Sequence, residues 1–163
     1  MTYLGGAALV LVALAACAAP PRDPTICMSY DGIHAADIRA GVALWESTGE
    51  VSVRWDCADA DTNITVGSYA ADWRGQTRVQ FGHITRVEFN TRAISETSTE
   101  WSSVSAHEFG HTMGLDHGGG VDAIMHGPSG GCLDADDLRQ MCEVRVCSRE
   151  HSADMPSCLG APR

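Results

Sequence analysis

The segment from residue 107 to residue 117, His-Glu-Phe-Gly-His-Thr-Met-Gly-Leu-Asp-His, most constrains what this chain can fold into. Residues four apart on an α-helix lie one turn apart on the same face, so His107 and His111 can converge on one cation at about 2.0–2.1 Å per Zn–N bond. Gly114 falls where the helix must end, and a residue without a Cβ can take the left-handed conformation of a helix stop. The turn would return His117 to the metal, so the sequence predicts a three-histidine zinc site.

The same segment indicates a catalytic rather than a structural zinc. Three neutral nitrogens leave the fourth position for water, which is the arrangement of catalytic sites. Glu108 follows the first ligand and can reach a metal-bound water without ligating the metal, so we expect it to be the general base. A purely structural site has no use for this carboxylate. The alternative of a non-catalytic, zinc-stabilised surface binding lipoprotein is therefore disfavoured, although it stays open.

The extended pattern resembles the metzincin signature H-E-x-x-H-x-x-G-x-x-H followed by a Met-turn. Ala123-Ile124-Met125 ends eight residues after His117 and looks like that turn, whose Met125 position lies beneath the metal in the family. The segment is most similar to the matrixins, which share the Gly-His-x-x-Gly-Leu-x-His helix end and the Ala-(Leu/Ile)-Met turn. The run from Leu133 to Leu138 resembles the opening of their last helix. The similarity covers most of residues 30 to 146 and is specific from 107 to 138.

Three features depart from the matrixin pattern. Gly118 follows the third histidine, where matrixins usually carry Ser. No Pro-Arg-Cys-Gly latency segment is present, so we expect no cysteine-switch propeptide. The number of cysteines is also unlike that of a typical matrixin catalytic domain. The assignment to metzincins is therefore stronger than the assignment to matrixins within them.

The resemblance implies a metzincin-like α+β fold with a twisted, mostly parallel β-sheet, two long helices, a Met-turn and a C-terminal helix. It also implies a zinc-dependent endopeptidase, in which zinc-activated water attacks the peptide bond of an extended polypeptide and Glu108 is the base. Substrate would lie against an edge strand, for which the expected segment is Ile84 to Asn90, and residues 126–133 would wall the pocket. The expected substrate-binding residues are Ile84, Val87, Phe89 and His126. A different amide substrate, such as a cell-wall crosslink, would use the same chemistry.

Further cation sites and ligand partners are expected from nearby residues. The resemblance makes a structural calcium possible in addition to the one catalytic zinc, although a solvated acidic loop is the favoured interpretation of the residues concerned: Asp56, Asp59, Asp61 and Asp72. No EF-hand spacing is present. Asp116 and Asp122 could orient a ligand imidazole. The remaining histidines, His34, His83 and His151, are expected at the surface or in local hydrogen bonds, and the four tryptophans are expected in the core.

Local patterns predict the order of the elements. Apolar spacing predicts a helix at 34–47 and a last helix at 134–146. Thr97 with Glu100 has capping-box spacing and predicts a helix at 97–113, although Ser102 or Ser105 could equally be the N-cap. β-Prone runs predict strands at 51–55, 63–69, 78–81 and 84–89. This order predicts a single α+β domain.

The N-terminus predicts export. Residues 4–16 are almost purely apolar but too short to span a bilayer, which needs about 20 residues. Leu14-Ala15-Ala16-Cys17 resembles a bacterial lipobox, in which Cys17 is lipidated, although no Lys or Arg precedes the apolar core. An ordinary cleaved signal is the alternative. We expect a signal peptide at 1–16, a lipid-anchored tether at 17–26 and the catalytic domain at 27–163.

Cysteine count and charge bear on compartment and partners. The chain has seven cysteines, and lipidation of Cys17 would leave six, enough for three disulfides in an oxidising compartment. We therefore expect a membrane-anchored lipoprotein at the cell envelope or a secreted protein. The net charge of −10 makes nucleic acid an improbable partner. We expect a monomer whose partner is a peptide or protein substrate and whose only membrane contact is the lipid anchor.

Overall fold

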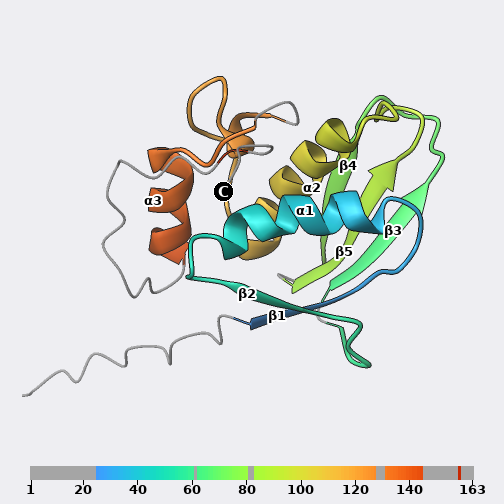
Figure 1. Ribbon diagram of the computed structural model, residues 1–163, viewed down its shortest axis with the longest axis horizontal. Coiled ribbons are helices and arrows are strands. Elements are labelled where there is room, and N and C mark those ends of the chain that lie inside the picture. Colours follow the sequence, from blue (N-terminus) through green and yellow to red (C-terminus); the bar gives the residue numbers. More distant parts are fainter. Residues whose placement is uncertain (1–24, 61, 81–82, 128–130, 145–157, 159–163) are drawn as a thin grey trace, which may run out of the picture.

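The computed structural model describes residues 25–60, 62–80, 83–127, 131–144 and residue 158. Within them, five strands form one sheet in the spatial order β2-β1-β3-β5-β4 (Figure 1). All neighbours are parallel except β4, which runs antiparallel to β5. The strands are β1 (Thr25–Ser29), β2 (Ser52–Trp55), β3 (Thr62–Gly67), β4 (Gly75–Gln80) and β5 (His83–Asn90). The mostly parallel sheet with its helices confirms the predicted α+β class.

Three α-helices and one 3-10 turn accompany the sheet. Helix α1 (Ala35–Glu46) connects β1 to β2, and α2 (Ser98–Met113) follows β5. The 3-10 turn η1 (Ile124–His126) and helix α3 (Ala135–Val144) come after α2. Figure 1 shows α1 and α2 side by side against the sheet, with α3 beyond the end of α1. Among the described residues, none of these helices has the length and apolar character that crossing a bilayer requires.

The core lies between the sheet and the pair α1 and α2. Strands β1, β3 and β5 contribute alternate side chains to it, because successive side chains of a strand point to opposite faces of the sheet. These buried side chains are Ile26, Met28, Ile64, Val87 and Phe89. The helices contribute their two largest side chains, Trp45 and Trp101, which are almost completely buried.

Helices α1 and α2 cross closely at Gly41. A Cβ at this position would clash with the backbone oxygen of Ser102 and would lie 2.8 Å from the backbone nitrogen of Ala106. Trp45 donates from Nε1 to the carbonyl oxygen of Ala106 at 2.8 Å across the same contact. Because a small residue and a buried hydrogen bond hold the two backbones together, α1 fixes the position of the helix that carries the histidine pair.

The predicted start of α2 is confirmed at Thr97, whose side chain accepts from the backbone N–H of Glu100. The other two N-cap candidates, Ser102 and Ser105, lie inside the helix. Ser102 and Ser105 donate instead to backbone carbonyl oxygens of α1, at 3.0 and 2.8 Å. Serine hydroxyls that the sequence allowed as caps therefore serve the packing between the helices.

Strand β1 was not predicted from the sequence. It begins at Thr25, two residues before the expected start of the domain at 27, and pairs with Ser52 of β2 in parallel register. Its apolar run Ile26-Cys27-Met28 is buried throughout and lacks the alternation that predicts a half-exposed strand. The expected signal peptide and most of the tether, with Cys17, lie outside the described residues.

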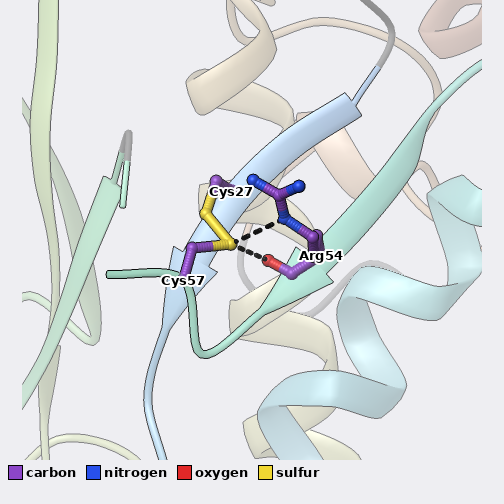
Figure 2. The surroundings of a disulfide bond; sticks show 3 residues. All are labelled: Cys27, Arg54 and Cys57. Atoms are coloured by element: carbon purple, nitrogen blue, oxygen red, sulfur yellow. Dashed lines mark hydrogen bonds between the residues drawn. A yellow bond between two sulfur atoms is a disulfide. The ribbon is translucent and has the colours of Figure 1, made fainter. Parts of the chain in front are cut away.

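Disulfides occur, as predicted for an exported chain. Cys27 in β1 is bonded to Cys57 after β2, across a separation of 30 residues. Figure 2 shows this bridge beside Arg54, whose Nε donates to the Cys57 sulfur at 3.1 Å. Cys132 is bonded to Cys158, and Cys142 is also disulfide-bonded. The bridge at Cys132 lies next to the segment that carries the Met-turn, because this residue pairs with Ala123.

Candidate metal centre

The three predicted histidines converge. The Nε2 atoms of His107 and His117 are 3.1 Å apart, those of His107 and His111 are 3.2 Å apart, and those of His111 and His117 are 3.3 Å apart. Three tetrahedral ligands at about 2.05 Å from zinc are separated from one another by about 3.3 Å. The triad therefore fits a zinc ion. Among the described residues it is the one group of three or more potential ligands that lie close enough to hold a metal.

Backbone carbonyls orient two of the ligand rings. His107 Nδ1 lies 2.7 Å from the oxygen of Ile124, and His111 Nδ1 lies 2.8 Å from the oxygen of Leu115. A proton held at Nδ1 by these carbonyls leaves Nε2 free to ligate. Asp116 and Asp122, whose carboxylates were expected to orient a ligand ring, are exposed, and the two carbonyls take this role. The sequence could not reveal this, because every residue has a carbonyl.

Burial keeps these imidazoles neutral. The pKa of His107 is lowered to about 4, mainly by burial and also by the neighbouring His111 and His117, while the hydrogen bond to Ile124 acts in the opposite direction. Burial likewise lowers the pKa of His111. Neutral imidazole is the form that binds a metal, so protons compete little for these two ligands near neutral pH.

The predicted helix-ending turn has the expected geometry. Gly114 closes α2 with φ 94° and ψ 17°, the left-handed conformation that glycine adopts most easily. Its N–H donates to the oxygens of Gly110 and His111. The chain then reverses over Leu115 and brings His117 beside the other two histidines.

The predicted Met-turn packs against the helix that carries His107 and His111. Met125 is fully buried in η1, and its side chain packs against Gly110, between the two histidines of α2. Asp137 of α3 accepts hydrogen bonds from the backbone N–H of Met125 at 3.3 Å and of Asp134 at 3.1 Å. The turn is thus held between α2 and α3, which places the Ile124 oxygen against His107.

Glu108 lies buried beside the triad, only 4% exposed. Thr77 of β4 donates to its carboxylate, with an Oγ1–Oε2 distance of 2.8 Å. Burial raises the pKa of Glu108 to about 7, while the hydrogen bonds from Thr77 act in the opposite direction. A carboxyl group with a pKa near neutrality can both accept and return a proton, which suits acid–base chemistry.

A cleft of about 540 Å³ opens over these groups. One wall is the metal centre: His107, Glu108, His111 and His117. The other described wall is the start of β4 and the loop before it: Asp72, Trp73, Arg74, Gly75, Gln76 and Thr77. Trp73 was expected in the core and lines the cleft instead.

The expected edge strand was wrong. β5 lies inside the sheet between β3 and β4, and its Val87 and Phe89 are buried at 2% and 1% exposure in the core. The edge beside the cleft is β4. Ile84 lies on β5 as well, and His126, which is exposed in η1, is not among the described residues that line the cleft. The structure therefore brings none of the four expected substrate-binding residues to the cleft.

The buried side chain of Asn90 holds the cleft wall in place. Its Oδ1 accepts from the N–H of Tyr69 at 3.0 Å, and its Nδ2 donates to the oxygens of Ala71 and Trp73 at 3.0 and 3.1 Å. Oδ1 also accepts from Arg92 N–H at 3.1 Å. Sequence reasoning missed this residue, because a single asparagine at a strand end carries no local signal for a loop some twenty positions earlier.

The expected calcium site stays untested. Asp61 lies outside the described residues, as do residues 128–130 of the segment that was expected to wall the pocket. Asp56 pairs with Arg39 at 3.3 Å, and Asp72 belongs to the cleft wall. His34 stacks on Trp101, with ring centroids 3.9 Å apart.

Comparisons with known proteins bear on the whole site. The sequence model of the matrixin family matches residues 44–140, which include every residue of the metal centre. The fold is similar to a chain of the GM1-bound ECX AB5 holotoxin, with 14% identity, a TM-score of 0.46, and coverage of 74% of this chain and 70% of that one. It is also similar to archaemetzincin from Methanopyrus kandleri, with 17% identity, a TM-score of 0.43, and coverage of 80% and 93%. A search of curated proteins gives no match.

Proposed function

This chain belongs to the matrixin family, and from that premise we propose that it is a zinc-dependent endopeptidase acting on extended polypeptides. The observation that carries the proposal is the convergence of three imidazole nitrogens, 3.1–3.3 Å apart, beside the buried carboxylate of Glu108. Both features open into one cleft. A site that only stabilised the fold would need the nitrogens but not the carboxylate.

His107, His111 and His117 would hold the zinc through their Nε2 atoms. Zinc bound there supplies Lewis acidity, which polarises a carbonyl and lowers the pKa of water. The two carbonyl partners of His107 and His111 keep their Nδ1 protons and maintain the ligating tautomer. Burial of these rings keeps them unprotonated, so the chain is prepared for a cation before one arrives.

Glu108 would transfer the proton. Its carboxylate accepts a proton from the attacking water and returns it to the leaving amine. The positive charge of a dication in the triad favours the ionised carboxylate and so opposes the effect of burial on its pKa. General acid–base catalysis contributes about 10²–10⁴ in rate, which sets the expected loss when this carboxylate is removed.

Substrate would bind along the free edge of β4. The strand ends the sheet on the side of the cleft, and Gly75, Gln76 and Thr77 line that cleft. An extended peptide can add a strand at such an edge through main-chain hydrogen bonds. This replaces β5 as the strand that presents the peptide bond to the metal centre.

We also propose that the protein works outside the cytoplasm, as a lipoprotein anchored through Cys17 or as a secreted monomer. The disulfides of the described residues support an oxidising compartment. The apolar segment at 4–16 and the lipobox-like sequence support export. Mass spectrometry of the protein isolated from its producing cell tests the lipid, since acylation would add mass to a chain beginning at Cys17.

Incubation of the purified protein with a diverse peptide library tests the activity. We expect cleavage that stops with a zinc chelator and returns when zinc is added back, and cleavage that is about 10²–10⁴ slower in Glu108→Gln. The glutamine variant is the matched control because it keeps the size of the side chain and removes only the acid–base group. Zinc binding without cleavage of any peptide would refute the endopeptidase proposal and favour a binding protein or a different amide substrate.

A further inference from the structure

Strand β4 contacts Glu108 at two positions of the same face. We propose that Thr77 and Gly75 form a carboxylate seat, meaning the hydroxyl of Thr77 and the space beside Gly75, which positions Glu108 for proton transfer. Thr77 is the positioning residue of this pair. The inference rests on the proposed function of Glu108 as the base, and it adds to β4 a second role beside that of a strand edge.

The hydroxyl of Thr77 reaches two atoms of Glu108. Its Oγ1 lies 2.8 Å from Oε2 of the carboxylate and 3.0 Å from the backbone oxygen of the same residue. A threonine hydroxyl has one proton, and a charged acceptor makes the stronger bond. The Thr77 hydroxyl lies between the carboxylate of Glu108 and the backbone oxygen of Glu108. It therefore restricts the torsions of the Glu108 side chain, which otherwise has several rotamers.

Gly75 leaves room for the other side of the carboxylate. A Cβ at this position would lie 2.6 Å from both Cγ and Oε1 of Glu108, and 2.8 Å from a methyl group of Val104. These distances are far below ordinary van der Waals contact, which is about 3.5–4.0 Å between carbon atoms. The strand therefore has no side chain at the place where the carboxylate lies.

The two positions act together because of the strand geometry. Residues two apart on a strand share a face. Thr77 pairs with Val87 and Gly75 pairs with Phe89, and both partners on β5 face the core beneath α2. Among the side chains that the structure describes, Thr77 is the one that hydrogen-bonds to this carboxylate. A preorganised base avoids the loss of rotamer freedom during the reaction.

Thr77→Val and Thr77→Ser in the full, zinc-loaded protein test the seat. Valine has the shape of threonine without the hydroxyl, so we expect kcat to fall about tenfold, as for the loss of a hydrogen bond to a charged group, with KM and zinc content unchanged. Serine keeps the hydroxyl and should stay within about twofold of the wild type. Thr65→Val is the matched control on β3, outside the described lining of the cleft, and should leave kcat unchanged.

A merely structural contact would lower stability in Thr77→Val without changing kcat of the folded enzyme. Unchanged kcat in Thr77→Val, or equal loss in the serine and valine variants, would overturn the proposal.

A double-mutant cycle of Thr77→Val with Glu108→Ala measures the contact through stability and does not depend on activity. We expect the two substitutions to be coupled about tenfold in the unfolding equilibrium constant of the zinc-loaded protein. If the wild type cleaves no peptide, the proposed function fails, while coupling below about twofold overturns the seat itself.

Discussion

Replacing Gly41 by alanine tests whether the close crossing of α1 and α2 holds the metal-bearing helix in place. Helix propensity alone favours the substitution, because alanine is better than glycine inside a helix by about 1 kcal/mol. Packing opposes it. The added Cβ would lie 2.9 Å from the Cβ of Ser105 and 2.8 Å from the backbone nitrogen of Ala106, and closer still to the backbone oxygen of Ser102.

The magnitude follows from these contacts. Ordinary contact between carbon atoms begins at about 3.5 Å, so the helices must separate by about 0.6 Å or more. Most of the atoms involved are backbone atoms, which cannot rotate away, and the shift would stretch the 2.8 Å bond from Trp45 to Ala106. Overpacking of a buried contact costs about 1–3 kcal/mol, and this contact belongs at the upper end. After subtraction of the propensity gain, we expect a net loss of about 2 kcal/mol.

Denaturant unfolding of the zinc-loaded protein measures this loss, with Ala40→Gly as the matched control. Ala40 is exposed on the same helix, so its replacement by glycine should cost about 1 kcal/mol through propensity alone. If packing at Gly41 dominates, both substitutions lower the free energy of unfolding. If helix propensity alone acts, Gly41→Ala raises this free energy and Ala40→Gly lowers it. A free energy of unfolding that rises by about 1 kcal/mol in Gly41→Ala would refute the close crossing.

Three further outcomes follow from the site. Burial raises the pKa of Glu108 from 4.5 to about 7. The contribution of this carboxyl group to the stability of the metal-free protein is therefore complete below pH 4.5 and is lost as the pH rises through 7. The unfolding free energy of the metal-free wild type minus that of Glu108→Gln should therefore fall by about 3 kcal/mol over this range, and a flat difference would show that the carboxyl group is not desolvated. Gly114→Ala should lose at least about 1 kcal/mol because of its φ of 94°, although no atom of the described residues lies within 4 Å of the added Cβ. Gly127→Ala, in extended backbone and with equal space among the described residues, should be nearly neutral in the same denaturant assay. Asn90→Asp should lose about 2–4 kcal/mol, since a buried carboxylate cannot donate to the oxygens of Ala71 and Trp73; wild-type stability and an unchanged KM would show that this side chain does not hold the cleft wall.

The metal centre could be predicted from the sequence because its information is local. The two histidines of α2, the glycine that ends the helix and the third histidine lie within eleven consecutive residues, and helix geometry alone brings the first pair together. The cap at Thr97 is local too, since it satisfies an N–H only three residues away. Such features do not depend on how the rest of the chain folds.

The cleft wall could not be predicted, because it depends on the order of strands in the sheet. The sequence indicated strands near residues 78–81 and 84–89 but contained no signal that the first of them lies at the edge. The missed β1 has the same origin, since its burial comes from neighbours distant in sequence. The roles of Thr77, Trp73 and Asn90 arise only when β4 pairs with β5 and contacts α2.

The most direct measurement is of zinc content and peptide hydrolysis in the same preparations of wild type and Glu108→Gln. The account predicts about one zinc ion per chain in both proteins, because the three imidazoles would hold the metal without Glu108. It predicts hydrolysis by the wild type and a kcat about 10²–10⁴ lower in the variant. Wild-type hydrolysis by a zinc-loaded Glu108→Gln protein, or a wild type that binds no zinc, would contradict it.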